Sequence, residues 1–309
     1  MKTTRREFIK QGLILGSAIS AAPLLPLAAK TSFGSTPQPT LALVTGDKAQ
    51  ATRKAVQMLG GMEAFVKKGS RVILKPNMSF PHAPERATNT SPEVVSTIAR
   101  MCMDAGAKEV LVLDFPFNRP EPCLRLSGIA DMCKQIPNVY TFALTEEKFF
   151  RSIPVPKGKV ITSVKIIKDI LESDVLISIP TAKSHTTTGV SLGMKGLMGI
   201  MWDREYFHAK VDINQAIADL VSAVKIDLTV LDASRALLNG GPSGPGKIEK
   251  PNTIIAGRDP VAVDALGVTL VDWYGQKFQA SQVKHIAAAN AMGLGIMDLN
   301  AVKVLRAQV

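Results

Sequence analysis

Short apolar runs alternate with longer segments of helical spacing along the chain from residue 40 onward. The first runs are TLALVTG (40–46), RVILKPN (71–77) and EVLVLDF (109–115), and segments with helical periodicity lie between them at 50–66 and 91–105. The runs are rich in Val, Ile and Leu without polar alternation, which is typical of strands covered by helices on both faces. The pattern therefore predicts an α/β fold with a doubly wound, mostly parallel sheet and helices on both faces.

The same pattern returns in the second half of the chain. DVLISIP (174–180), LTVLDA (228–233) and NTIIAG (252–257) are further strands, and helices are predicted at 212–224 and 260–274. Two proline-rich stretches, FPFNRPEP and IPVPKGK, indicate loops in between and leave room for a small second lobe inserted at 116–173. We expect one α/β domain over residues 36–309.

Residues 1–35 read as an export leader and linker. TTRREFIKQG precedes an apolar run of about fifteen residues, and its Arg5–Arg6 pair resembles the twin-arginine signature. A basic start to a soluble domain or an uncleaved membrane anchor are the alternatives, but a membrane span needs about 20 apolar residues. We therefore expect the twin-arginine export machinery as a partner, a periplasmic or otherwise exported protein, and no stable membrane span after cleavage.

Net charge and cysteine content limit the kinds of partner and cofactor that this protein can bind. The formal net charge is +11, of which the leader carries +4, so the remainder stays basic. Aromatics are only 5% of residues and do not interleave with basic runs, which argues against nucleic acid and leaves anionic small molecules or a membrane surface. Cys102, Cys123 and Cys133 have no C-x-x-C spacing, so they build no iron–sulfur cluster; Cys123 and Cys133 form a disulfide, or all three fill apolar positions.

Charged or polar side chains follow five of the predicted strands. In open α/β sheets, ligands bind beyond the carboxyl ends of the strands, so side chains placed there are candidates for one shared crevice. We predict binding of an anionic small molecule or cofactor by Lys75, Asn77, Lys183, Lys195 and Asp259, and catalysis by His185, His208, Asp114 and Asp232.

The segment from Lys183 to Gly199 carries much of this chemistry. Gly193, Gly196 and Gly199 at three-residue intervals either let backbone amides approach an anion or form a close-packing face. His185 and His208 supply two imidazoles, which suit proton transfer or a divalent metal. The glycine-rich loop 238–247 closes over a site or merely turns, and it lacks the spacing of a nucleotide-binding loop.

The order of these motifs resembles the family known as domain of unknown function 362 (DUF362). The resemblance rests on ILKPN (73–77), IPTAKSH (179–185), MKGLMG (194–199) and GRDPVAVDA (257–265), together with Asp114, His208 and the 238–247 loop. It implies the α/β fold and this site, but no settled activity. Relatives often carry a lysine and an asparagine where this chain has Thr181 and Gly196, and some carry an appended ferredoxin-like cluster that this chain lacks.

Three hypotheses follow for the function. The first is an exported enzyme that binds a carboxylate or phosphate compound in a Lys/His/Asp crevice. The second is a metal or redox accessory protein that uses His185, His208, Asp114 and Asp232 as mixed nitrogen and oxygen ligands. The third is a non-catalytic receptor for an anionic solute.

Overall fold

A long sheet forms the centre of the computed structural model, which describes residues 38–309; the predicted leader lies outside the described residues. Its main path has the strand order β13-β1-β12-β10-β7-β2-β3-β4. These strands are β1 (Thr40–Thr45), β2 (Arg71–Pro76), β3 (Glu109–Asp114), β4 (Val139–Ala143), β7 (Val175–Ile179), β10 (Leu228–Leu237), β12 (Thr253–Gly257) and β13 (Lys303–Gln308). Three shorter strands extend this sheet: β8 (Thr181–His185) and β11 (Ile248–Glu249) pair with β10, and β9 (Gly189–Ser191) pairs with β8.

Strand direction confirms the mostly parallel sheet. β10, β7, β2, β3 and β4 pair in parallel, and β1 pairs in parallel with β13. β12 is the exception, because it runs antiparallel to both β1 and β10. The carboxyl ends of the parallel strands therefore share one edge of the sheet, and the carboxyl end of β12 lies at the opposite edge.

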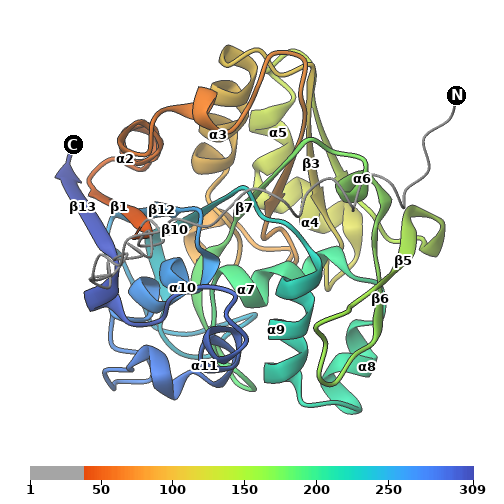
Figure 1. Ribbon diagram of the computed structural model, residues 1–309. Coiled ribbons are helices and arrows are strands. Elements are labelled where there is room, and N and C mark those ends of the chain that lie inside the picture. Colours follow the sequence, from red (N-terminus) through yellow and green to blue (C-terminus); the bar gives the residue numbers. More distant parts are fainter. Residues whose placement is uncertain (1–37) are drawn as a thin grey trace, which may run out of the picture. The chain divides into compact units, whose positions relative to one another are not determined.

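Helices cover both faces of the sheet, as predicted (Figure 1). Along β2, Val72 and Leu74 pack in the core under α2, α3 and α5, whereas Ile73 packs in the core with α7, α9, α10 and α11. The helices are α2 (Lys48–Met58), α3 (Pro92–Asp104), α4 (Pro120–Ser127), α5 (Ile129–Cys133), α6 (Lys168–Leu171), α7 (Gly193–Gly196), α8 (Arg204–Ala209), α9 (Ile213–Ala223), α10 (Pro260–Val268) and α11 (Lys284–Ala291). Short 3-10 helices lie at Met62–Ala64, Pro84–Arg86, Glu147–Phe149, Leu197–Ile200, Ala280–Gln282 and Leu299–Ala301.

The first predicted helix, 50–66, is shorter in the structure. α2 begins after Asp47, whose carboxylate accepts hydrogen bonds from the backbone amides of Ala49 and Gln50. It ends before Gly60 and Gly61, whose φ angles of 101° and 78° are left-handed and favour glycine. The helix therefore stops at Met58, and only a 3-10 turn follows.

The region 116–173 is divided between two sheets. β4 joins the main sheet, while β5 (Phe150–Pro154) and β6 (Ser163–Ile167) form a separate antiparallel pair. Buried Phe150 and Ile166 of this pair belong to the same hydrophobic core as α9. The pair is thus attached to the domain by apolar packing.

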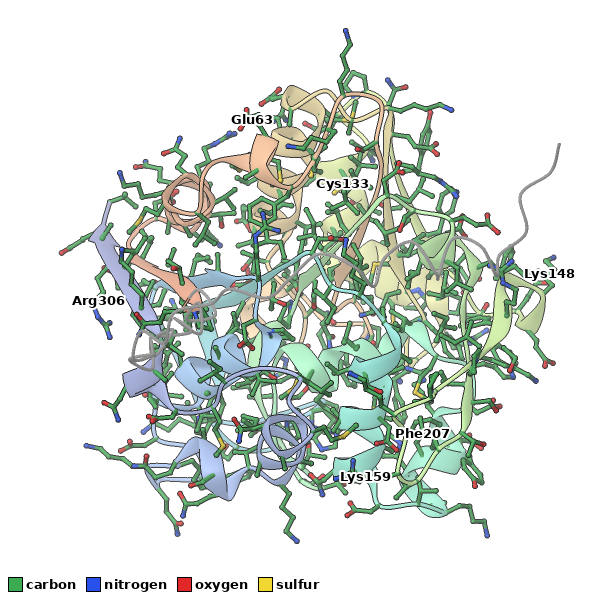
Figure 2. All side chains as sticks on the ribbon, in the orientation of Figure 1. Glu63, Cys133, Lys148, Lys159, Phe207 and Arg306 are labelled. Carbon is green, nitrogen blue, oxygen red and sulfur yellow. The ribbon has the colours of Figure 1, made fainter. Side chains whose placement is uncertain are left out.

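All three cysteines are free and buried, so the disulfide alternative is wrong and the packing alternative holds. Cys133 lies at the end of α5, where Figure 2 marks it, and burial raises the pKa of its thiol to about 11. Among residues 38–309, no helix is both long and apolar enough to cross a membrane.

Candidate functional site

A cavity of about 350 Å³ opens at the edge where the carboxyl ends of the parallel strands meet. Five of the predicted site residues line it: Asn77, Lys183, His185, Lys195 and His208. The other lining residues are Ser79, Phe80, Phe117, Thr186, Thr187, Ser191, Gly196, Met198, Gly199, Arg204, Pro242 and Ser243. The loop 238–247 therefore contributes to the wall through Pro242 and Ser243.

A β-hairpin carries two of these side chains. β8 continues beyond β7 along β10 and pairs with β9, in a register that sets Lys183 opposite Ser191 and His185 opposite Gly189. Because side chains alternate along a strand, Lys183 and His185 share one face of β8. Ser184 points the other way, and its hydroxyl accepts a hydrogen bond from the backbone N–H of Gly241.

The turn that carries Lys195 is held by a carboxylate that sequence reasoning missed. Both oxygens of buried Asp264 in α10 accept backbone hydrogen bonds at the start of α7, from Gly193 N (2.7 Å) and Met194 N (2.9 Å). A Cβ atom on Gly193 would lie only 2.7 Å from Asp264 Oδ1, so the approach requires glycine. The glycine-rich segment does bring backbone amides to a carboxyl group, which is that of Asp264; burial raises the pKa of this group to about 7. Asp264 is the second aspartate of GRDPVAVDA (257–265), and a carboxylate in the middle of an otherwise apolar helix was the signal for it in the sequence.

Lys75 and Asp114 form an ion pair behind the cavity wall. Lys75 Nζ lies 2.9 Å from Asp114 Oδ1, and the two side chains are 2% and 0% exposed. The other carboxylate oxygen accepts hydrogen bonds from Met78 N and the Ser79 hydroxyl. Both residues thus shape the loop that places Asn77 and Ser79, and neither lines the cavity.

Lys183 is tethered inside the cavity wall. Its ammonium donates a 2.6 Å hydrogen bond to the carbonyl oxygen of Thr88 and lies 4.5 Å from the centre of the Phe80 ring. With its amide oriented to satisfy both ends, Asn77 donates to Thr88 O and accepts from Lys183 Nζ at 3.2 Å. Burial and nearby Lys195 lower the pKa of Lys183, while these acceptors and the aromatic face stabilise its charged form.

Lys195, unlike Lys75 and Lys183, has no partner within the described residues. It is 8% exposed, it lines the cavity, and its Nζ makes no hydrogen bond or ion pair with any residue of 38–309. Burial, followed by the charges of Arg204 and Lys75, lowers its pKa to about 7. Both effects favour the neutral amine over the ammonium form.

The two cavity histidines are held in opposite tautomers. His185 Nδ1 accepts a 3.2 Å hydrogen bond from the backbone N–H of Thr187, so its proton lies on Nε2. His208 Nδ1 lies 2.8 Å from the carbonyl oxygen of Arg204 and must donate to it, which leaves Nε2 as an acceptor. The ring centres are 6.4 Å apart. Burial, then Lys195 and Lys183, lower the pKa of His185 to about 2, so it stays neutral at physiological pH.

The sequence comparison that decides the family covers this whole site. The model of the family described as "Domain of unknown function (DUF362)" matches residues 72–269, a range that contains every residue lining the cavity. The chain belongs to the DUF362 family.

One similar sequence and two solved structures of similar fold accompany the DUF362 match. A thylakoid-associated protein of Synechocystis is 27% identical over 227 residues, which cover 71% of this chain and 68% of that protein. Among solved structures, lactate racemase apoprotein from Thermoanaerobacterium thermosaccharolyticum is 17% identical with a TM-score of 0.48, and a Thermotoga maritima protein is 13% identical with a TM-score of 0.41. The matched regions cover 75% and 81% of this chain, but only 57% and 60% of those two chains.

The first residues of GRDPVAVDA, Arg258 and Asp259, lie away from the cavity, whereas Asp264 at its end supports the turn of Lys195. The prediction that Asp259 belongs to the shared crevice is wrong, because antiparallel β12 delivers it to the opposite edge of the sheet. There its carboxylate caps α10 through Val261 N and Ala262 N and accepts a hydrogen bond from Ile296 N. Arg258, at the same end, donates to the carbonyl oxygen of Ala64.

Asp232 also lies outside the cavity wall, so its predicted place in a shared crevice is wrong. Its Oδ2 accepts a 2.7 Å hydrogen bond from Ser91 N at the start of α3, and its Oδ1 accepts from the backbone and hydroxyl of Ser234. Both oxygens are occupied in a side chain that is 1% exposed. Asp232 therefore joins β10 to the start of α3.

The donor set does not fit the predicted mixed metal site. Asp114 is paired with Lys75 and Asp232 is bonded to Ser91 and Ser234, which leaves two imidazoles alone. Within residues 38–309, no group of three or more His, Cys, Asp or Glu side chains could hold a metal ion. The imidazoles are instead surrounded by lysines, which repel cations.

Arg204 was not predicted as a site residue. Its guanidinium donates to the carbonyl oxygens of Phe115 (2.8 Å) and Pro116 (2.7 Å) and lies 3.9 Å from the centre of the Phe115 ring. This anchors α8, and with it His208, beside the cavity. A second hollow of about 930 Å³ adjoins the first through Phe117, Arg204 and His208, and aromatic side chains dominate its wall: Phe115, Phe117, Trp202 and Tyr206.

Proposed function

We propose that this protein binds a small anionic molecule by its carboxylate or phosphate group and exchanges a proton with it. The observation that carries the proposal is the amine of Lys195, which faces a cavity and makes no hydrogen bond or ion pair with any of residues 38–309. A bound anion would supply the missing partner.

Lys183 supports the same assignment. An ammonium group has three N–H donors, and Thr88 O and the Asn77 amide oxygen account for two of them. No hydrogen-bond acceptor within residues 38–309 takes the third N–H, and Lys183 lines the cavity in which a ligand would bind. With Arg204 at the same wall, positive charge predominates there, which favours an anion in a site of low dielectric constant.

The histidine tautomers support proton exchange. His185 offers an Nε2–H donor and His208 offers an Nε2 acceptor, and both residues line the cavity. Such a pair can protonate one atom of a ligand and deprotonate another. The adjoining aromatic hollow would accommodate an apolar portion of the ligand.

Export is part of the proposal. We propose that the chain leaves the cytoplasm by the twin-arginine route and acts in the periplasm or a comparable compartment, on the strength of the motif at Arg5–Arg6 and the apolar run after it. Fusing residues 1–40 to a reporter that is active only after export, with Arg5→Lys/Arg6→Lys as the matched control, tests this part. Export that survives the double substitution would contradict it.

Calorimetric titration with inorganic phosphate and with acetate tests the binding site. Lys183→Met and Lys195→Met should each weaken binding by about tenfold or more and reduce its dependence on salt, because each removes one charge-assisted hydrogen bond. Lys148→Met is the control, since Lys148 is a 65% exposed side chain beside β5 (Figure 2). The absence of phosphate and acetate binding at millimolar concentrations, or equal affinities in all four proteins, would contradict the proposal.

A further inference from the structure

Three buried lysines lie close together, and the structure gives each a different state. Lys75 is ion-paired with Asp114, Lys183 is hydrogen-bonded to Thr88 O, and Lys195 is unpartnered within residues 38–309. Their charges act on one another, because Lys75 and Lys195 both oppose protonation of Lys183, and Lys75 opposes protonation of Lys195. Among residues 38–309, Lys195 is the one of the three whose amine has no partner and faces the cavity, which leaves its nitrogen free to react.

We propose that Lys195 is a nucleophile that forms an imine with an anionic carbonyl compound, such as a 2-oxo acid or an aldehyde acid. The inference rests on the proposed function, since the anionic group of the ligand would bind at Lys183. A lysine becomes nucleophilic when it is desolvated or placed beside other cations, because both favour the neutral amine. Lys195 meets both conditions, since it is buried and has Arg204 and Lys75 nearby.

The cavity also holds the groups that imine formation requires. Lys195 Nζ adds to the carbonyl carbon, the electron pair of the C=O π bond moves to oxygen, and a proton passes from nitrogen to that oxygen to give a carbinolamine. The hydroxyl group then leaves with a second proton as water while the nitrogen lone pair forms the C=N bond. His208 Nε2 can accept the first proton and His185 Nε2–H can donate to the oxygen, and no oxidant or reductant is consumed.

The geometry keeps Lys195 available for this reaction. Asp264 fixes the backbone of α7 through Gly193 N and Met194 N, so the turn that bears Lys195 is held while its amine makes no bond. The cavity volume of about 350 Å³ suits a small organic acid. Lys75 cannot substitute, because Asp114 and the Pro76 carbonyl oxygen already hold its ammonium.

Reductive labelling of the full chain with formaldehyde and cyanoborohydride tests the nucleophile without any knowledge of the natural ligand. Peptide mass spectrometry gives the labelling rate of each lysine at pH 7 and pH 10, and exposed Lys148 is the internal control. An ordinary lysine with a pKa near 10.4 is about one part in 2,500 neutral at pH 7. An amine of lower pKa is also a weaker nucleophile, which offsets part of the gain from its larger neutral fraction. We therefore expect Lys195 to be labelled at least tenfold faster than Lys148 at pH 7, and no faster than Lys148 at pH 10.

Two results would overturn the inference: a Lys195 rate at pH 7 no higher than that of Lys148, or no labelling of Lys195 even at pH 10, which would show that a one-carbon aldehyde cannot reach the amine.

Glyoxylate, an anionic aldehyde, then separates this inference from the proposed function. We expect glyoxylate to label Lys195 faster than formaldehyde does, and Lys183→Met to lower that ratio by about tenfold. Fast formaldehyde labelling with no preference for glyoxylate would instead count against the anion site, and loss of phosphate binding in Lys195→Met without fast labelling would count against the nucleophile alone.

Discussion

The wall behind the cavity and the cavity itself use the same kinds of side chain in opposite ways. Behind the wall, Lys75 and Asp114 are almost fully buried. Asp114 Oδ1 has the ion pair with Lys75, and the other polar atoms of the pair make hydrogen bonds with Pro76, Met78 and Ser79. In the cavity, Lys195 is nearly as buried and has no partner among the described residues. A buried charged side chain is therefore not by itself a sign of a functional site. A charged side chain that lines a cavity and has no partner in the protein is a stronger sign.

Gly199 shows how closely the two regions are built together. It lines the cavity on one side, and on the other a Cβ atom at this position would overlap Asp114 Oδ1 and lie 2.8 Å from Lys75 Nζ. Glycine is therefore required for the ion pair to pack directly under the cavity. The backbone at Gly199 thus lies between the cavity that Lys195 lines and the ion pair of Lys75.

The largest expected effect comes from breaking the ion pair. Asp114→Asn keeps the shape of the side chain but leaves the Lys75 ammonium buried without a counter-charge, which typically costs about 3–5 kcal/mol. We expect a loss of stability of that size in urea unfolding at pH 7. A loss of this size would show that the ion pair behind the wall stabilises the fold.

The double variant Lys75→Met/Asp114→Leu is the control for this change. Replacing both charges by apolar groups of similar volume is often close to neutral, so it should recover most of the stability lost in Asp114→Asn. Equal losses in the single and double variants would mean that packing volume, not the pairing of charges, holds this region.

The comparison also shows why the fold could be predicted so fully from the sequence. The apolar runs around Ile73, Val112 and Ile177 are buried on both faces, and that composition predicted the doubly wound sheet, which the structure confirms. Strand direction was not predictable in the same way. Nothing in NTIIAG distinguishes a parallel from an antiparallel strand, so Asp259 was placed at the wrong edge of the sheet.

The site was predicted in part, for a physical reason. Position after a strand correctly brought Lys183, His185 and Asn77 to one cavity, because parallel carboxyl ends converge. Position does not show whether a side chain will find a partner, so Asp114, Asp232 and Lys75 were grouped with them although hydrogen bonds and an ion pair occupy their polar atoms. Asp264 and Arg204 were missed because the backbone groups they bind come from distant parts of the chain.

A smaller effect should come from removing the unpartnered lysine. Burial lowers the pKa of Lys195 to about 7, so between pH 7 and its unfolded value near 10.4 the unfolded state binds more protons. The free energy of unfolding must therefore rise with pH between about pH 7 and pH 10.4. Below pH 7, the folded state bears the full cost of burying a protonated Lys195. We expect Lys195→Met to be neutral or stabilising at pH 6 by about 1 kcal/mol, and to flatten the rise in stability between pH 7 and pH 10.

Urea unfolding at pH 6, 8 and 10 measures this directly, with Lys148→Met as the exposed control. The result should be opposite in sign to that of Asp114→Asn. If Lys195→Met is destabilised by several kcal/mol at pH 6, the amine has a structural partner, and the contrast between the two regions fails.

The smallest effect on stability, and the sharpest test of the chemistry, concerns the histidine pair. His208 is exposed on α8, so His208→Asn should change stability by no more than about 0.5 kcal/mol, while the asparagine amide can still donate to Arg204 O.

Nitrogen NMR of the imidazoles should show a proton on Nε2 of His185 and on Nδ1 of His208, with no protonation of His185 between pH 5 and pH 9 because its pKa is near 2. The His185 tautomer should persist in His208→Asn, since it depends on Thr187 N–H and not on the neighbouring ring. A proton on Nδ1 of His185 would give the cavity two acceptors and no imidazole donor, and the region would then be basic in charge but unable to pass a proton in both directions.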